Sequence, residues 1–190
     1  MNKIWYKKSA KNWREALPIG NGFTGVMVYG SHKRERFCFN DGTLWSGYPK
    51  DYNSADSLNH LEKVRKLIFE GRNNEADALC EDKLKGFYSE TFLPLGDIVL
   101  AFNGTDKNIN TRVLDLSTGI HTVESSGCKS EIFSSYPDKI TVYKIKSDKR
   151  FSVKIKAKSK LHHHVSTESA MLTLYGNAPD YIAPNYLRTE

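Results

Sequence analysis

HTVESSGCKSEIFSSYPDKITVYKIKSDKRFSVKIKAK, from His121 to Lys158, is the stretch of sequence that decides the fold class. Apolar and polar residues alternate along it in short runs, and Gly, Pro, Asp and Ser separate the runs. β-type runs that follow one another without intervening helices argue against a parallel, doubly wound sheet. Their spacing is typical of an antiparallel sandwich. We therefore expect a mainly β protein.

The same pattern continues on both sides of this stretch. A helix is expected over 55–69, where apolar residues recur every three or four positions, and Gly71 is expected to end it. Asn73 is a candidate cap for a second helix that ends before Gly86. The fold class is therefore a large antiparallel β-sandwich with a short helical insertion at about residues 55–85, in one domain over 1–190. Strands are expected over 25–30, 35–40, 98–102, 121–125, 129–135, 139–146, 151–158 and 171–175.

Composition excludes several classes of protein. A hydrophobic share of 39% is that of a folded globular chain rather than a disordered one. The sequence contains no run of 18 apolar residues, the length that a membrane-spanning helix needs. The first eight residues lack the apolar core of a signal peptide, so we expect a cytoplasmic protein unless a leader is missing. Three widely spaced cysteines argue against a disulfide framework or a zinc cluster. No metal, cofactor or membrane partner is expected.

The net charge of +6 raises the possibility of nucleic-acid binding. Basic residues are mostly interspersed with acidic ones, and only the segment 144–160 is strongly basic. Its lysines alternate with apolar residues, which on a strand places the charges on one solvated face. We therefore expect no nucleic-acid partner.

Two motifs suggest ligands but lack the context that those ligands need. The segment 20–25, GNGFTG, matches the dinucleotide pattern GxGxxG, yet a β-like run follows it where a helix N-terminus should meet a pyrophosphate. A glycine-rich turn leading into a strand is the better interpretation. The three consecutive histidines at 162–164 would point to opposite faces of a strand, so a polar loop or strand end is favoured over a metal site. Cys38 lies between two phenylalanines and is expected to be a buried structural thiol.

The most informative loop is NDGTLWSGYP, from Asn40 to Pro49. It places Trp45 and Tyr48 among glycines and hydrogen-bonding residues. An aromatic side chain in such a loop either anchors the loop by packing or offers a surface on which a sugar ring or another domain can stack. Packing is favoured, because tryptophans are usually buried.

Six ordered blocks of sequence run from ALPIGNGFTGVMVYG (16–30) through FNDGTLWSGYPKD (39–51) to GNAPDYIAPNYL (176–187). In this order they resemble the opening of glycoside hydrolase family 95. They span nearly the whole chain, which makes the resemblance far more specific than any single motif. The family pattern in the second block has an acidic pair where this chain has Asp41 and Gly42. The blocks are ALPIGNGFTGVMVYG (16–30), FNDGTLWSGYPKD (39–51), LPLGDIVLAF (93–102), RVLDLSTGIHTV (112–123), EIFSSYPDKITVYKI (131–145) and GNAPDYIAPNYL (176–187).

The resemblance implies the N-terminal β-sandwich of an α-L-fucosidase-like enzyme. In that family an (α/α)6 barrel follows the sandwich and carries inverting catalysis, in which an acid and a water-activating group stand roughly 6.5–9.5 Å apart. No catalytic residue can therefore be assigned to this chain, which is expected to be silent alone and to lack the end of the sandwich. Its expected partners are the barrel of the same enzyme and, through the parent enzyme, a fucosylated oligosaccharide.

The loop residues are the candidate site for that partnership. We expect the loop to lie at the barrel interface and to shape the rim of the sugar pocket. The candidate residues are Asn40, Asp41, Thr43, Trp45 and Ser46.

Other interpretations stay open. The chain could be a stand-alone carbohydrate-binding module, with Trp45, Tyr48, Phe87 and Tyr88 as stacking surfaces, or a structural domain that pairs with a separately encoded barrel. If the sandwich is incomplete, an uncovered sheet edge predicts self-association or poor solubility.

Overall fold

The computed structural model describes residues 2–51, 53–86, 89–105 and 108–183. The chain divides into two compact units, one formed by 1–45 and 92–179 and the other by 46–91 and 180–190. The first unit holds twelve strands and the second holds the helices α1 and α2. The expected mainly β class with one helical insertion is confirmed.

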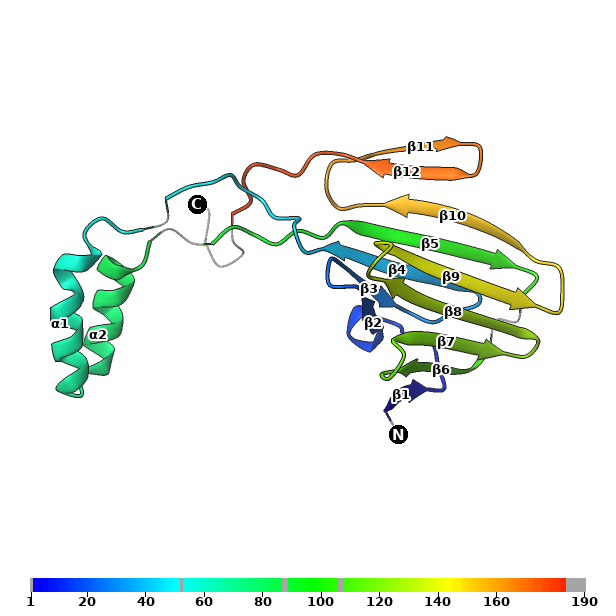
Figure 1. Cartoon of the computed structure of the whole chain (residues 1–190), viewed down its shortest axis with the longest axis horizontal. Coiled ribbons are helices and arrows are strands. Elements are labelled where there is room, and N and C mark those ends of the chain that lie inside the picture. Colours follow the sequence, from blue (N-terminus) through cyan, green and yellow to red (C-terminus); the bar gives the residue numbers. More distant parts are fainter. Residues whose placement is uncertain (1, 52, 87–88, 106–107, 184–190) are drawn as a thin grey trace. The chain divides into compact units, whose positions relative to one another are not determined.

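The first unit consists of two five-stranded antiparallel sheets and a hairpin (Figure 1). A 3-10 turn, Trp13–Glu15, precedes β2. In spatial order the first sheet contains β1 (Lys3–Tyr6), β6 (Ile109–Asp115), β7 (Ile120–Ser125), β8 (Cys128–Ser135) and β9 (Ile140–Ser147). The second sheet contains β10 (Ser152–Lys158), β5 (Gly96–Asn103), β4 (Arg34–Asp41), β3 (Thr24–Val28) and β2 (Leu17–Gly20). The hairpin pairs β11 (His164–Glu168) with β12 (Met171–Tyr175).

The core forms because alternate residues of both sheets are apolar. Successive side chains of a strand point to opposite faces, so each alternating run contributes one buried row. Val28 is fully buried and Ile132 is 1% exposed, and both belong to the same cluster although they lie in different sheets. The buried members of this cluster are Leu17, Ile19, Val26, Val28, Phe37, Leu100, Phe102, Leu114 and Ile132.

A layer of buried polar residues lies alongside this core. His32 is fully buried, and its two ring nitrogens contact the hydroxyls of Ser125, at 2.7 Å, and Ser130, at 3.0 Å. Glu35 is also fully buried and accepts hydrogen bonds from the backbone N–H groups of Gly30, Ser31 and Arg36, each at 2.9 Å. Pairing of this kind is required, because an unpartnered buried polar group costs free energy.

Arg112, on the inner face of β6, attaches the N-terminal segment to the first sheet. Its Nε donates to the carbonyl of Lys8 and its Nη2 to the carbonyl of Glu15, both at 2.7 Å, and its guanidinium lies 4.4 Å from the ring centre of Tyr6. Gly30 packs against this side chain with φ +71°, and a Cβ there would lie 2.8 Å from the Cδ of Arg112. Only glycine fits both the conformation and the space.

The second unit contains a helical hairpin. It is made of α1 (Ser57–Phe69), α2 (Asn73–Leu79) and a π-helical turn (Cys80–Leu84). Gly71 ends α1 with φ +75°, and the N–H of Arg72 reaches back to the carbonyl of Leu67, which is a Schellman motif. Asn73 begins α2, but its side chain does not cap the helix, because Arg72 occupies the cap position. Val64, Leu67 and Ala76 form the small core of the hairpin.

The eight strands expected from the sequence are confirmed, and β1, β2, β6 and β11 are additional. Each of these four departs from plain alternation. β2 contains Pro18, which is tolerated because β2 is an edge strand. β6 buries an arginine, and β11 begins at the third of three histidines. Every residue of β1 is exposed, so its sequence carries no burial pattern.

Candidate functional site

The predicted loop begins at the end of β4. Asn40 and Asp41 are still within the strand, opposite Gly25 and Thr24 of β3. The carboxylate Oδ1 of Asp41 accepts hydrogen bonds from the N–H of Thr43, at 2.9 Å, and from its hydroxyl, at 2.6 Å. These bonds, the hydroxyl's above all, lower the pKa of Asp41. Asp41 is therefore ionised and fixes the turn locally.

Gly42 joins the turn to two exposed aromatic groups. Its N–H donates to the carbonyl of Phe23 at 2.8 Å, and its carbonyl accepts from the indole Nε1 of Trp45 at 3.1 Å. Phe23 lies in the β2–β3 loop, so this one residue connects the loop after β4 to the neighbouring hairpin. The backbone of the turn is thus held from both sides.

Trp45 is both packed and exposed. It forms an isolated antiparallel bridge with Phe92, and their rings meet edge to face at 5.2 Å. The adjacent Leu93 is 1% exposed and donates its N–H to the carbonyl of Leu44. Trp45 nevertheless remains 48% exposed, so packing fixes the ring while much of its surface stays open. Anchoring and stacking are compatible at this residue.

A second aromatic pair lies beside the loop, and sequence reasoning missed it. Phe23 stacks on Tyr136 of the β8–β9 loop at 5.8 Å, and the Nζ of Lys139 lies 5.0 Å from the Phe23 ring centre. Asn21 holds the two loops together, because its Nδ2 donates to the carbonyl of Ser135 and its Oδ1 accepts from the N–H of Phe23. A phenylalanine within a glycine-rich turn was the available signal. We call Phe23, Trp45, Phe92 and Tyr136 the aromatic rim.

Ser46 belongs to the second unit and is 3% exposed. Its hydroxyl donates to Glu90 at 3.1 Å and accepts the N–H of Thr91. Lys50 pairs with the same carboxylate at 2.5 Å. Ser46 therefore has a buried structural environment, in contrast to the exposed Trp45. Tyr48 is 65% exposed, whereas Phe87 and Tyr88 lie outside the described residues.

The glycine-rich turn has the structural role expected of it, whereas Cys38 was expected to be buried and is only half-buried, because it lies on the face of β4 opposite the core residues Phe37 and Phe39. The segment 20–25 connects β2 to β3 as a hairpin, with no helix after it. The Sγ of Cys38 lies 4.0 Å from the hydroxyl of Tyr29. Burial, with a contribution from Asp97, raises the pKa of Cys38 to about 11, so the nucleophilic thiolate is disfavoured at neutral pH.

The histidine segment forms the approach to β11. The rings of His162 and His164 meet edge to face at 5.3 Å, and His164 stacks on Tyr175. Within the described part of the chain no group of three or more His, Cys, Asp or Glu side chains could hold a metal ion. Among the same residues, no helix has the length and apolar character needed to span a membrane.

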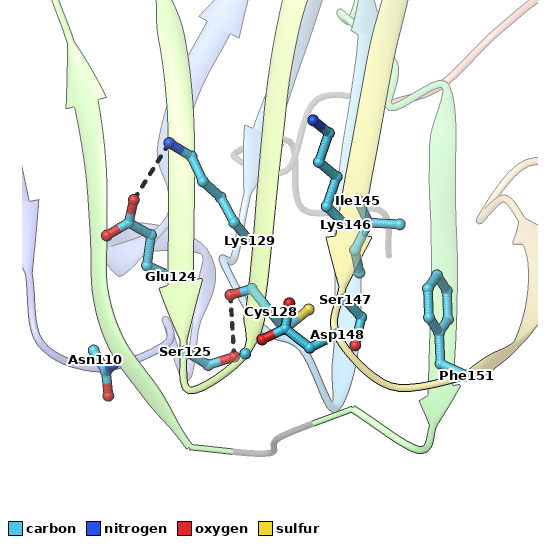
Figure 2. A pocket seen from close by; sticks show the side chains of 11 residues that line it. Asn110, Glu124, Ser125, Cys128, Lys129, Ile145, Lys146, Ser147, Asp148 and Phe151 are labelled. Carbon is cyan, nitrogen blue, oxygen red and sulfur yellow. Dashed lines mark hydrogen bonds and ion pairs between the residues drawn. The ribbon is translucent and has the colours of Figure 1, made fainter.

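A pocket at the far ends of β7, β8 and β9 offers no catalytic pair. Its two carboxylates belong to Glu124 and Asp148, and Glu124 pairs with Lys129 at 3.4 Å. Figure 2 shows Glu124 turned toward Lys129 and away from Asp148, while the hydroxyl of Ser125 is directed to the carbonyl of Cys128. Acid catalysis of glycoside cleavage needs two carboxylates that flank one bond, and these two do not converge.

Three other carboxylates of the β-sheets have local partners as well. Asp97 pairs with Arg36 at 2.8 Å, and Asp115 accepts the N–H of Ser117 at 2.9 Å. Glu131 on β8 lies 3.4 Å from the Nζ of Lys129. Together with Asp41, these groups serve strand pairing and turns.

Comparison with known proteins adds the following similarities. A family model described as "Glycosyl hydrolase family 65, N-terminal domain" matches residues 4–189. The chain is 33% identical over 176 residues to "Alpha-L-fucosidase 2" of Arabidopsis thaliana, which covers 87% of this chain and 21% of that protein. It is 32% identical over 160 residues to "Probable alpha-fucosidase A" of Aspergillus oryzae (strain ATCC 42149 / RIB 40), covering 77% and 22%. The chain thus spans about a fifth of the length of these curated relatives.

Proposed function

We propose that this chain has a non-catalytic role in an enzyme that hydrolyses terminal α-L-fucosides. The chain belongs to the glycosyl hydrolase family 65 N-terminal domain family. The chain is homologous over most of its length to α-L-fucosidases, and it is the N-terminal β domain of such a glycoside hydrolase. The resemblance to glycoside hydrolase family 95 is thereby confirmed. Fucoside hydrolysis, its substrates and the division of labour between domains are the proposal.

In this proposal the β-sandwich is a scaffold and a helical barrel of the same enzyme cleaves the bond. Inverting cleavage requires an acid on one side of the sugar and an activated water on the other. The carboxylates of Asp41, Asp97, Asp115 and Glu124 lie in local ion pairs and turns instead, and Glu35 is fully buried among backbone N–H groups. The barrel is therefore the partner that carries the catalytic pair, and the sugar reaches this domain at the edge of that site.

The proposed role of the loop rests on one observation: the turn from Asp41 to Thr43, with its ionised carboxylate, lies next to four partly exposed aromatic rings. The rings of the aromatic rim are between 40% and 65% exposed. Aromatic surface of this kind packs against another domain or against the apolar face of a sugar ring. We assign Asn40, Asp41, Thr43 and Trp45 to the barrel-facing rim of the sugar pocket, while Ser46 supports the adjoining segment from its buried position.

The test replaces the residue that corresponds to Trp45 by alanine in a full-length relative such as the Arabidopsis α-L-fucosidase 2. We expect kcat/KM for an aryl α-L-fucoside to fall about tenfold, the effect of losing roughly 1.4 kcal/mol of contact. The matched control changes the residue that corresponds to Trp5 to alanine and should leave activity unchanged, since Trp5 is 60% exposed on the edge strand β1. Equal activity and equal thermal stability for both variants would remove the proposed role of the loop.

A stand-alone carbohydrate-binding module remains the alternative, and the exposure of Trp45 and Tyr48 favours it. Calorimetry of this chain with neutral fucosylated oligosaccharides distinguishes the two. A module gives saturable heat that the Trp45→Ala variant loses, whereas a scaffold domain gives none.

A further inference from the structure

A basic groove lies on the outer face of the second sheet, separate from the aromatic rim. It has a volume of about 770 Å³ and lies between the 3-10 turn, the strands β4 and β5, and the segment after β10. Trp13 of the 3-10 turn lines it and is 56% exposed. Tyr29 and Phe39 also line it, and a concave site of this size with aromatic side chains and several polar groups has the properties of a small-ligand pocket.

The charge of the groove is strongly positive. Four cationic side chains line it against one carboxylate, that of Asp97. Asp97 is satisfied by two of them, because Arg36 donates to it at 2.8 Å and the Nζ of Lys158 lies 3.5 Å away. The other two, Lys11 and Lys160, have no side-chain ion pair with any described residue. The groove therefore has spare positive charge next to an open indole.

The uncharged lining suits a polyhydroxylated ligand. Asn40 contributes an amide to the groove and Ser159 a hydroxyl, and both groups exchange hydrogen bonds with sugar hydroxyls. An indole surface receives the C–H face of a pyranose ring. Lysine ammonium groups pair with carboxylate or sulfate. These three features together select a sugar that carries negative charge.

We propose that this groove binds an acidic oligosaccharide, with one pyranose ring against Trp13 and a carboxylate or sulfate group beside Lys11 and Lys160. The choice of a carbohydrate over other anions rests on the proposed function. Single-stranded nucleic acid fits less well, because its binding surfaces stack successive bases on several aromatic side chains, whereas Trp13 is the aromatic residue most open to this groove. The site would let the domain hold an acidic glycan while the barrel acts on fucose.

The test is calorimetric titration of the 190-residue chain with tetragalacturonate and with its fully methyl-esterified form. Esterification replaces each negative carboxylate by a neutral methyl ester on the same sugar chain, so we expect saturable binding of the acid, weakened by salt, and at least about tenfold weaker binding of the ester. A sulfated tetrasaccharide derived from heparin distinguishes a sulfate site from a carboxylate site. Binding of either acidic probe supports the proposal.

Two variants locate the binding. Trp13→Ala should weaken binding of both acid and ester about tenfold, the effect of losing one ring-stacking contact. Lys11→Gln combined with Lys160→Gln should remove the preference for the acid over the ester. The matched control, Lys144→Gln with Lys146→Gln, removes the same charge from β9 of the first sheet and should change neither. Unchanged thermal midpoints establish that the variants are folded.

Three results would overturn the proposal: no saturable binding of either acidic probe, equal binding of acid and ester, or wild-type binding by Trp13→Ala. Tighter binding of a tetrathymidylate than of both acidic sugars would assign the groove to nucleic acid instead. Failure here is distinguishable from failure of the proposed function, because fucosidase activity of the full-length relative is measured on a neutral aryl fucoside, which lacks the carboxylate or sulfate group that this groove is proposed to bind.

Discussion

Two buried groups of the sandwich, Glu35 and His121, have opposite effects on stability as the pH changes. Both are fully buried. Burial raises the pKa of Glu35 from 4.5 to about 7, because desolvation outweighs the hydrogen bonds from backbone N–H groups. Burial also lowers the pKa of His121 from 6.5 to about 4, and the nearby charge of Arg112 lowers it further. Neither ring nitrogen of His121 has a hydrogen-bond partner among the described residues.

The direction of each effect follows from which state binds the proton more tightly. Folded Glu35 holds its proton more tightly than unfolded Glu35, so its contribution is fully present below pH 4.5 and is lost as the pH rises to about 7. Folded His121 resists protonation, so its contribution is present above pH 6.5 and is lost as the pH falls to about 4. Each gap in pKa corresponds to about 3 kcal/mol. The two contributions therefore nearly cancel between pH 4.5 and 6.5.

Glu35→Gln and His121→Leu should reveal the two halves of this balance. The Glu35→Gln substitution can change the free energy of unfolding by an amount that does not depend on pH. On top of that amount, the free energy of unfolding of the variant should rise by about 3 kcal/mol relative to wild type from about pH 4.5 to about pH 7. His121→Leu should fall by about 3 kcal/mol relative to wild type between about pH 4 and about pH 6.5. Urea titrations followed by tryptophan fluorescence supply these values.

Comparing each variant with wild type removes the contribution of the exposed carboxylates, such as Asp41 and Asp115, whose pKa values are lowered in both proteins. If the difference for Glu35→Gln does not change with pH, then Glu35 titrates in the folded protein as it does in the unfolded chain, and the reasoning from burial is refuted.

Three further predictions concern packing. Gly30→Ala should cost about 2–4 kcal/mol in urea unfolding, because a side chain is strained at φ +71° and its Cβ meets Arg112; a loss under about 1 kcal/mol would contradict this. Arg112→Met should cost about 2–4 kcal/mol and raise proteolysis of the N-terminal segment, since the backbone carbonyls of Lys8 and Glu15 lose the buried guanidinium that holds them; an unchanged cleavage rate would be inconsistent with that tether. The chain should self-associate in sedimentation, because Val153 and Ile155 of the edge strand β10 are 42% and 50% exposed. These two residues pair with the core residues Phe102 and Leu100 of β5, so Ile155→Lys should reduce the association. A clean wild-type monomer would count against this prediction.

The strands that sequence could predict are those in which apolar and polar residue types alternate along the chain. β8 and β9 are of this kind, and turn residues mark their ends. β6 was missed because it buries Arg112, whose partners are the carbonyls of Lys8 and Glu15, 104 and 97 residues away. No local pattern reports a partner so distant. The helical insertion was predictable because its periodicity and the Gly71 cap are local features.

In the candidate site, too, sequence could predict the local features but not the contacts between distant residues. The turn from Asp41 to Thr43 depends on bonds between residues two positions apart, so its composition indicated it. The pairing of Phe23 with Tyr136 depends on Asn21 bridging two loops that are 114 residues apart, and only the folded structure reveals it. Ser46 was grouped with its neighbours by sequence, although its burial against Glu90 places it in a different environment.

The scaffold role is tested most directly by fucose release from an aryl α-L-fucoside. The purified 190-residue chain and the full-length Arabidopsis relative are assayed side by side at equal molar concentration. A scaffold domain releases no fucose above the buffer rate, while the relative turns over the substrate. Release by this chain alone at a rate comparable to that of the relative would contradict the assignment of bond cleavage to a separate barrel.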